Sequence, residues 1–204
     1  MVKSRHSFFG SFSLNTVRII GGEWRRRVLR FPDAQGLRPT PDRVRETLFN
    51  WLGQDLAGWR VLDAFAGSGA LGFEAASRGA AEVTLLERDA RVAASLEASR
   101  RRLGGTQMRV ECADAMAWMR RSPPGRFELV LLDPPFDAGL ADAALALAAE
   151  LVVDGGFVHL ESSSVPTALP PGLQPWRSMR AGAVHVSLLR RRYTADDLSR
   201  SPLS

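Results

Sequence analysis

The chain has 204 residues, of which 45% are hydrophobic and 24% are charged. These proportions exclude a disordered or fibrous chain and favour one globular domain with a sizeable core. No apolar run approaches the roughly 18–20 residues that span a bilayer, and the first residues lack the pattern of a secretory signal. The single cysteine, Cys112, excludes an intramolecular disulfide and a cysteine-based zinc site. We expect Cys112 to be a buried apolar residue in a cytosolic protein.

The charge is distributed unevenly along the chain. The formal net charge is +5, from 27 basic and 22 acidic residues. Residues 1–60 carry 11 basic and 5 acidic side chains, a net of +6, whereas residues 61–180 carry 12 and 15, a net of −3. All basic residues except Lys3 are arginine. Codon bias could set that ratio but does not explain the asymmetry, which favours a polyanionic partner such as nucleic acid.

The amino-terminal region is predicted to contain a tail and a hairpin. Residues 1–16 are polar and serine-rich, which predicts a disordered segment. The apolar run Val17–Ile20 meets Gly21-Gly22, and Trp24–Leu29 is predicted to return as the second strand. Four arginines lie on this small element: Arg18, Arg25, Arg26 and Arg27.

A helix is predicted to follow, with Thr40 as its N-cap, Pro41 at its first position and Gly53 at its end. Its apolar face is formed by residues spaced at i, i+4 and i+8: Val44, Leu48 and Leu52. By the same spacing a different face carries Arg43, Glu46 and Asn50.

From Arg60 onward, short apolar runs alternate with helical stretches. Strands are predicted at 61–65, 82–86, 108–112, 127–132 and 157–160, and helices near 70–78, 90–103, 114–120 and 139–151. This alternation predicts an α/β fold with a doubly wound, mostly parallel, Rossmann-like sheet. Residues 176–180 and 184–189 leave no room for a crossover helix, so we expect an antiparallel hairpin at the end.

The first of these strands runs into a glycine loop. Gly67, Gly69 and Gly72 fit the spacing G-x-G-x-x-G after a strand and before a helix, which is a dinucleotide-binding fingerprint. Glu87 lies twenty residues after Gly67 at the end of the next strand, where a carboxylate can hold ribose hydroxyls. Alone, this pattern favours nicotinamide, flavin and S-adenosylmethionine almost equally, and the glycines can also form a purely structural turn.

Two aspartates make the prediction more specific. Asp63 stands four residues before Gly67, where Rossmann oxidoreductases usually carry an apolar residue, and a carboxylate there suits a ligand with a cationic amino group. Asp114 follows the third strand, where it could bind the exocyclic amine of an adenine. Each also has a structural interpretation, because aspartate is a good N-cap and turn residue.

The fourth strand ends in Asp133-Pro134-Pro135-Phe136. The prolines fix the backbone and have no N–H groups of their own, so the turn can present a carboxylate and a carbonyl as paired acceptors. Two acceptors suit a flat exocyclic NH2 group and relieve positive charge as its nitrogen is alkylated. Phe136 could stack on a base removed from its neighbours. The structural alternative is a Pro-Pro loop that only terminates the strand.

The glycine loop and the Asp-Pro-Pro-Phe turn resemble amino-group methyltransferases that use S-adenosylmethionine. Three further blocks, Arg18–Trp24, Leu37–Thr40 and Asp42–Leu52, make the chain similar to the bacterial guanine-N2 methyltransferases, type D, of 16S ribosomal RNA. The resemblance covers about residues 17–192, and the Arg-Pro-Thr and Arg-Glu-Thr-Leu-Phe-Asn blocks are far more specific than the glycine loop. Residues 1–16 match nothing in that family.

The resemblance implies a class I S-adenosylmethionine-dependent methyltransferase domain at 59–193, an RNA-binding extension at 17–58 and a flexible tail at 194–204. It also implies methylation of the exocyclic N2 amine of one guanine, position 966 in the usual 16S RNA numbering. The expected partner is a 30S subunit or a late assembly intermediate, with its ribosomal proteins, and the expected state is a monomer. We expect no membrane partner and no metal site.

The same resemblance, together with the charge of the predicted hairpin, assigns residues to three groups. The donor-site residues are Asp63, Phe65, Gly67, Gly69, Glu87, Arg88, Asp114 and Ala115. The residues that would hold the target base are Asp133, Pro134, Pro135 and Phe136. The residues that would bind or order RNA are, by the resemblance, Arg38, Thr40, Arg43 and Glu46 and, by the basic charge of the predicted hairpin, Arg18, Arg25, Arg26 and Arg27.

Other charged residues and the histidines are weaker candidates for a functional role. Arg100, Arg101 and Arg102 end a helix, where cations offset the helix dipole, so they are predicted to be structural or solvated. Residues 190–192 are three arginines that close the last strand, where either RNA contact or a structural role is open. The three histidines, His6, His159 and His185, have no metal-ligand spacing.

Three alternative functions remain open beside the main interpretation. An N6-adenine methyltransferase could use the same acceptors, and the labelled nucleoside would distinguish it. Asp63 and the Asp133 turn argue against a nicotinamide oxidoreductase, which a thermal-shift comparison of S-adenosylhomocysteine with NAD would test. A non-catalytic RNA-binding assembly factor would show no turnover on 30S particles.

Overall fold

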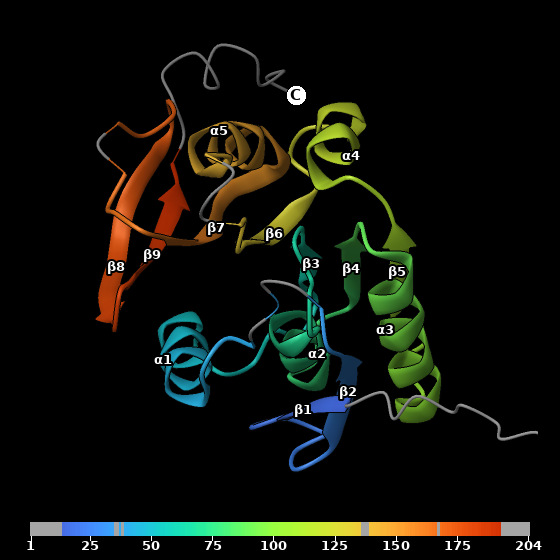
Figure 1. Cartoon of the computed structure of the whole chain (residues 1–204). Coiled ribbons are helices and arrows are strands. Elements are labelled where there is room, and N and C mark those ends of the chain that lie inside the picture. Colours follow the sequence, from blue (N-terminus) through green and yellow to red (C-terminus); the bar gives the residue numbers. More distant parts are fainter. Residues whose placement is uncertain (1–13, 35–36, 38, 136–138, 167, 193–204) are drawn as a thin grey trace, which may run out of the picture.

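The computed structural model describes residues 14–34, 37, 39–135, 139–166 and 168–192. Two sheets are present in this part of the chain: a two-stranded sheet β1-β2, and a seven-stranded sheet with the order β5-β4-β3-β6-β7-β9-β8. Figure 1 shows the larger sheet between two groups of helices, with the small hairpin beneath α2. The predicted α/β fold with a doubly wound sheet is therefore confirmed.

The large sheet is parallel through its first five positions and antiparallel at its end. Its strands are β3 (Arg60–Asp63), β4 (Glu82–Glu87), β5 (Met108–Cys112), β6 (Phe127–Leu132), β7 (Val152–Ser162), β8 (Leu173–Ala181) and β9 (Val184–Arg191). β3 pairs with β4 and β6, β4 with β5, and β6 with β7, all in parallel. β9 pairs antiparallel with β7 and β8, which confirms the predicted terminal hairpin. Because helices cover both faces, the central strands are continuous runs of buried aliphatic residues.

Within the described ranges, five helices connect these strands: α1 (Asp42–Leu52), α2 (Ala70–Ser77), α3 (Ala90–Leu103), α4 (Ala115–Arg121) and α5 (Ala141–Leu151). The core of one sheet face includes Leu48 of α1, Phe73 of α2 and Leu96 of α3. The core of the other face includes Met116 of α4 and Leu145 of α5. None of these helices is long and apolar enough to cross a membrane.

Helix α1 differs from its prediction at one end. Its N-cap is Pro41, and no side chain caps it, so the predicted cap by Thr40 is wrong. Thr40 is instead buried, and it lines a pocket. The predicted end is confirmed, because Gly53 adopts the left-handed conformation with φ 96°.

The amino-terminal hairpin is confirmed, but its strands lie further apart along the chain than predicted. β1 (Leu14–Arg18) pairs antiparallel with β2 (Val28–Pro32), in a register that opposes Arg18 and Val28. The prediction that residues 14–16 are disordered is wrong, because they belong to β1. Trp24 does not begin the second strand: it lies in the long turn, is 6% exposed, and its N–H donates to Ser77 Oγ at 2.8 Å.

The prediction that Cys112 is buried is also wrong. Cys112 is exposed, since it ends β5, and β5 is an edge strand of the large sheet. Its Sγ lies 3.8 Å from the carbonyl oxygen of Arg88. An apolar residue on a strand is buried on both faces only when neighbouring strands and helices cover it, and the edge position removes part of that cover.

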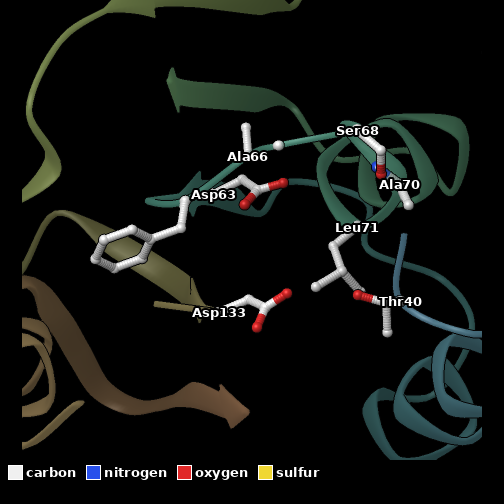
Figure 2. A pocket seen from close by; sticks show the side chains of 9 residues that line it. Thr40, Asp63, Ala66, Ser68, Ala70, Leu71 and Asp133 are labelled. Carbon is white, nitrogen blue, oxygen red and sulfur yellow. The ribbon is translucent and has the colours of Figure 1, made fainter. Parts of the chain in front are cut away.

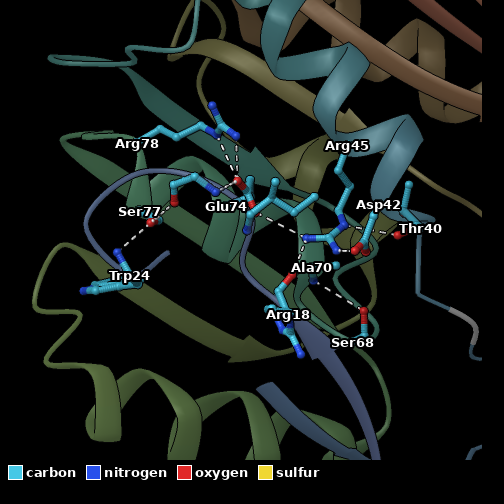
Figure 3. A network of polar contacts seen from close by, with 12 residues as sticks. Arg18, Trp24, Thr40, Asp42, Arg45, Ser68, Ala70, Glu74, Ser77 and Arg78 are labelled. Atoms are coloured by element: carbon cyan, nitrogen blue, oxygen red, sulfur yellow. Dashed lines mark hydrogen bonds and ion pairs between the residues drawn. The ribbon is translucent and has the colours of Figure 1, made fainter. Parts of the chain in front are cut away.

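A buried ion-pair network fixes the hairpin and α1 onto α2 (Figure 3). The Glu74 carboxylate, which is fully buried, accepts hydrogen bonds from the backbone N–H groups of Ile20 at 2.9 Å and Gly21 at 2.7 Å. It also accepts from Arg45 Nη1 at 3.3 Å and from Arg78 Nη2 at 2.8 Å. Arg45 is 0% exposed and donates to the carbonyl oxygen of Arg18 at 2.9 Å. We call Glu74, Arg45 and Arg78 the latch.

The close contact between the hairpin and α2 explains why glycines occupy positions 21 and 22. A Cβ atom on Gly22 would lie 1.8 Å from the carbonyl oxygen of Ser77, and the backbone of Gly22 has φ +72°. The two glycines therefore allow the hairpin to approach α2 closely, whereas the sequence suggested that they form a tight turn between strands. The hairpin shares the core of the sheet through Ile19, Leu29 and Phe31.

Candidate active site

A pocket opens at the carboxyl ends of β3 and β6. These strands are neighbours in the sheet, but the chain continues from β3 to β4 on the opposite side, so the pocket lies where the strand order reverses. Ligands of open α/β sheets bind at such a point. The pocket is lined by Thr40, Asp63, Phe65, Ala66, Gly67, Ser68, Ala70, Leu71 and Asp133 (Figure 2).

The glycine loop forms one wall of this pocket. Gly67 has φ +49°, and a Cβ atom added there would touch the Leu37 side chain at 3.8 Å, an ordinary contact without a clash. Its N–H donates to Glu87 Oε2 at 3.0 Å, and Glu87 Oε1 accepts from the N–H of Asp89 at 2.7 Å. The predicted carboxylate at the end of the second strand thus lies against the loop and orders it. Gly69 is the N-cap of α2.

Asp63 lies at the base of the pocket at the end of β3. It is 3% exposed, and its Oδ2 accepts from the N–H of Gly72 at 2.9 Å. A Cβ atom on Gly72 would lie 2.9 Å from that oxygen, so the third glycine of the loop is needed for this approach. Burial raises the pKa of Asp63 to about 7, the bond from Gly72 opposes this, and the charges of Glu87 and Glu161 add to it.

Asp133 faces the same pocket from the end of β6. In Figure 2 the carboxylates of Asp63 and Asp133 point into one space, with Leu71 and Thr40 on its far side. Burial raises the pKa of Asp133 well above its ordinary value, and the charges of Glu161 and Asp63 raise it further. Two carboxyl groups directed into one pocket cannot both ionise easily, because their charges repel. Groups with such shifted pKa values are typical of a functional site.

Two of the three residues that follow Asp133 in the turn are among the described residues. Pro134 is buried and Pro135 is exposed. Phe136, the predicted stacking residue, lies outside the described residues, so its role stays a prediction.

The remaining predicted donor residues lie further along the same edge of the sheet and do not line the pocket. Asp114 is exposed at the end of β5, and its Oδ1 accepts from the N–H of Ala117 at 2.8 Å, so it caps α4 as the structural interpretation expects. Arg88 is exposed after β4, and Ala115 is buried in the first turn of α4. The carboxyl ends of β3, β4 and β5 follow one another in the sheet, so a long ligand could reach from Asp63 to Asp114.

Those predicted RNA-binding residues that the structure describes are on the surface, apart from Thr40 in the pocket. Arg38 lies outside the described residues. The exposed members are Arg18, Arg25, Arg26, Arg27, Arg43 and Glu46. Arg43 and Glu46 share the exposed face of α1 with Asn50, as the helical spacing predicts.

The lesser candidates have structural partners. Arg100 and Arg101 donate to Glu97 at 2.6 and 2.7 Å, and Arg102 donates to the carbonyl oxygen of Val28 at 2.9 Å, which confirms their structural role. Arg190 packs over the rings of Phe157 and Trp176, at 5.6 and 5.1 Å from their centroids.

The sequence analysis missed two kinds of residue near the pocket. Leu71 and Ala70 line it from the first turn of α2, and nothing in their residue type indicates this. Glu161 does carry a signal: it is an acidic residue directly after the apolar run 157–160, at the carboxyl end of a central strand. Its charge acts on both Asp63 and Asp133.

The sheet order, the antiparallel final strands and a glycine loop facing two strand-end aspartates define a class I methyltransferase fold. Comparison with solved structures agrees. The chain superposes with a TM-score of 0.79 on "Putative methyltransferase yhhF from Escherichia coli", with 40% sequence identity over 87% of this chain and 99% of that chain. A Thermus thermophilus 16S rRNA methyltransferase, described in complex with AdoMet and guanosine, has a TM-score of 0.64 at 22% identity, covering 89% of this chain and 51% of that chain, and shows the same fold.

Comparison of sequences identifies the family. Residues 17–190 match the family model described as "Conserved hypothetical protein 95". The chain is 41% identical over 196 residues to "Ribosomal RNA small subunit methyltransferase D" of Escherichia coli strain K12, which covers 94% of this chain and 96% of the relative. The chain therefore belongs to this family, whose curated relatives include ribosomal RNA small subunit methyltransferase D.

Proposed function

We propose that this protein transfers a methyl group from S-adenosylmethionine to the exocyclic N2 amine of one guanine, position 966, in the 16S RNA of the small ribosomal subunit. One observation carries the chemistry: Asp63 and Asp133 face one pocket beside a glycine loop, with Asp133 followed by two prolines. The relative's name supports ribosomal RNA as the substrate. The base and the position come from the resemblance of the sequence motifs.

The donor half of the site fits S-adenosylmethionine. Gly67 lines the pocket and has no side chain, so a ligand could approach the backbone of the loop closely at the start of α2. Asp63 would accept from the amino group of the methionine part, Glu87 would hold the ribose hydroxyls, and Asp114 would accept from the adenine amine. A cationic ligand group beside Asp63 lowers the cost of ionising that buried carboxyl. The bound donor supplies an electrophilic methyl group.

The acceptor half would hold the flat amine of the target base. Asp133 and the carbonyl oxygen of Pro134 would each accept one N–H, which directs the nitrogen lone pair toward the methyl group. A fixed pair of acceptors also stabilises the positive charge that develops on nitrogen. Pro134 is buried and holds the turn in place, so little reorganisation is needed when the base enters.

The exposed arginines would supply the contacts to RNA. Arg25, Arg26 and Arg27 lie together in the long turn of the hairpin, and Arg43 lies on α1, the element that follows Thr40 of the pocket. Arginine pairs well with phosphate, and such contacts position a nucleic acid without reading its sequence. The latch would keep these arginines at a fixed distance from the pocket.

The test is transfer of a labelled methyl group to 30S particles isolated from a strain that lacks the enzyme, followed by mapping of the labelled nucleotide. We expect label at N2 of guanine 966 and none in DNA or free nucleotides. Label on the N6 amine of adenine would favour the alternative methyltransferase. No turnover together with tight 30S binding would favour an assembly factor, and stabilisation by NAD but not by S-adenosylhomocysteine would favour an oxidoreductase.

A further inference from the structure

Glu161 lies beside Asp133 at the carboxyl edge of the sheet. β6 and β7 are parallel neighbours whose register pairs Leu131 with His159 and Leu132 with Leu160, so the next position brings Asp133 level with Glu161. Neighbouring strands are about 4.8 Å apart. Side chains alternate between faces, so Leu131 and Asp133 share one face with His159 and Glu161.

Glu161 is a buried acid that lies against a buried histidine. It is 4% exposed, and its Oε1 lies 3.4 Å from Nε2 of His159, which is itself 0% exposed. Within the described part of the chain, His159 Nδ1 has no hydrogen-bond partner. With the proton on Nε2, His159 donates to Glu161 and fixes the direction of its carboxylate. Glu161 does not line the pocket, so it would act on the reaction through Asp133.

We propose that Glu161 is a positioning residue for Asp133, whose charge keeps Asp133 basic enough to take the proton that the target amine loses on methylation. The inference rests on the proposed function. In that step the amine lone pair forms a bond to the methyl carbon, and the carbon–sulfur bond breaks with its electrons passing to sulfur. The nitrogen then has one proton too many, and that proton moves to an Asp133 oxygen.

The groups around Asp133 agree with this role. β3 contributes Asp63 and β7 contributes Glu161 and His159, whereas β9 places apolar Val186 opposite Glu161. His185 of β9 is one position further along, so its side chain lies on the other face. After burial, Glu161 is the largest cause of the raised pKa of Asp133, ahead of Asp63. A base whose pKa lies near the working pH transfers protons most efficiently.

The experiment compares wild type with Glu161→Gln, which removes the charge but keeps the shape, and with Glu150→Gln as a control on the exposed side of α5. The first readout is a carbon-13 NMR titration of the Asp133 carboxyl, assigned with Asp133→Asn. The second is the pH profile of single-turnover methyl transfer to 30S particles. In Glu161→Gln we expect both the Asp133 midpoint and the acidic limb of the profile to move down by at least about one pH unit. We also expect the plateau rate to fall about 3- to 10-fold.

Retention of the wild-type Asp133 midpoint in Glu161→Gln, or a shift no larger than that of Glu150→Gln, would overturn the proposal. A shifted midpoint with an unchanged rate profile would overturn it as well, since the basicity of Asp133 would then not be used. If wild type itself transfers no methyl group, the proposed function fails, and the titration still reports separately on Glu161 and Asp133. Should Glu161→Gln not fold, Glu161→Met removes the same charge with a side chain of similar length, and the same shift is expected.

Discussion

At the residue scale, Asp63 shows a functional group that is held at a cost in stability. The pKa of Asp63 is raised to about 7 by burial, whereas an unfolded aspartate titrates near about 3.9. The folded protein therefore binds an extra proton between these values, so this contribution to stability is complete below about pH 4 and is lost as the pH rises through 7. Above pH 7 the buried carboxyl group of Asp63 is ionised. Without a cationic ligand to offset this charge, its burial lowers the stability of the fold.

Replacing Asp63 with asparagine should therefore stabilise the protein at high pH. The asparagine side chain can still accept from the N–H of Gly72 through its oxygen, but it carries no charge. We expect the unfolding free energy of Asp63→Asn at pH 8 to exceed that of wild type by roughly 1–4 kcal/mol, with the difference gone by about pH 4. Chemical denaturation at pH 4, 6 and 8 measures this. A variant no more stable than wild type at pH 8 would contradict the assigned burial cost.

Asp133 should matter for the rate of methyl transfer and not for binding of the donor. Asp133→Ala removes one fixed acceptor of the target amine while the glycine loop stays intact. We expect methyl transfer to 30S particles to fall at least ~10²-fold, the usual scale for one preorganised electrostatic partner, with S-adenosylhomocysteine affinity nearly unchanged by calorimetry. Asp142→Ala, on the exposed start of α5, is the control for loss of an acidic residue. Activity of Asp133→Ala within a few-fold of the control would remove Asp133 from the chemistry.

At the element scale, a comparison of two glycines can distinguish what the ligand requires from what the fold requires. A Cβ atom on Gly67, which lines the pocket, would touch only Leu37 and Phe65 at 3.8–3.9 Å. Gly125, a turn glycine before β6 with φ +60°, has no atom within 4 Å of the point where a Cβ atom would lie. Alanine at either position incurs a similar backbone strain of about 1–2 kcal/mol. Only Gly67→Ala should weaken S-adenosylhomocysteine binding, by at least about 10-fold, because the added methyl group occupies the ligand's space. Equal calorimetric affinities in both variants would exclude this loop as the donor site.

The elements that the sequence predicts well are those whose signals are local. Helix α3 has the bounds that the sequence predicts, residues 90–103, because Asp89 caps its start and Gly104 ends it in the left-handed conformation. The predicted strand residues 108–112 and 127–132 are also correct. Residues 129–132 form the apolar run of a buried parallel strand, and residues 108–112 alternate apolar with charged side chains, which is typical of a strand at an edge.

The features that the sequence does not predict depend on distant partners. Nothing near Arg45 in the sequence indicates that it is fully buried, because its partners include Glu74 and the Arg18 carbonyl oxygen. The pairing of Asp63 with Asp133 in one pocket follows from their places at strand ends, whereas Leu71 and the buried position of Thr40 depend on how α1 and α2 pack. Tertiary contacts decide such positions, and local propensity does not.

The latch gives the second prediction at this scale. Arg45→Met keeps an unbranched side chain but leaves the Glu74 carboxylate without one of its two arginines. Breaking a buried ion pair costs about 3–5 kcal/mol, so we expect the unfolding free energy to fall by that amount. Arg43→Met, on the exposed face of the same helix, should change it by no more than about 0.5 kcal/mol. Similar values for both variants in urea denaturation would show that the network does not stabilise the fold.

At the scale of the whole molecule, the basic and the catalytic parts are one packed body. Phe31 of the hairpin, Phe49 of α1 and Phe73 of α2 belong to one core cluster. The latch joins the same three elements, through an ion pair between α1 and α2 and through the hydrogen bond from the backbone N–H of Ile20 to Glu74. A basic extension held this firmly can set a fixed distance between a phosphate backbone and a base in the pocket. If the proposed function holds, the net charge of +6 in residues 1–60 against −3 in residues 61–180 would orient the molecule on an RNA surface.

The last prediction tests whether the hairpin turn is the part that contacts phosphates. Arg25, Arg26 and Arg27 are exposed, so replacing all three with glutamine should leave the fold and the donor affinity unchanged. Binding to 30S particles should weaken, and the slope of log affinity against log salt should flatten by about 0.7–0.9 for each phosphate that the protein no longer neutralises. Replacing Arg43 alone should instead lower turnover at saturating 30S, because it lies on the element that follows Thr40 of the pocket.

A matched triple variant keeps this test specific to the turn. Arg120, Arg121 and Arg180 are also exposed, but they lie at the end of α4 and on β8, which are away from the hairpin turn in Figure 1. Changing them to glutamine removes the same formal charge of three, so any effect of net charge alone on long-range attraction appears equally in both variants. Only the hairpin variant should show a flatter salt dependence. An equal weakening in both would assign binding to the overall field of the protein, and a wild-type slope in the hairpin variant would place the RNA contacts on another surface.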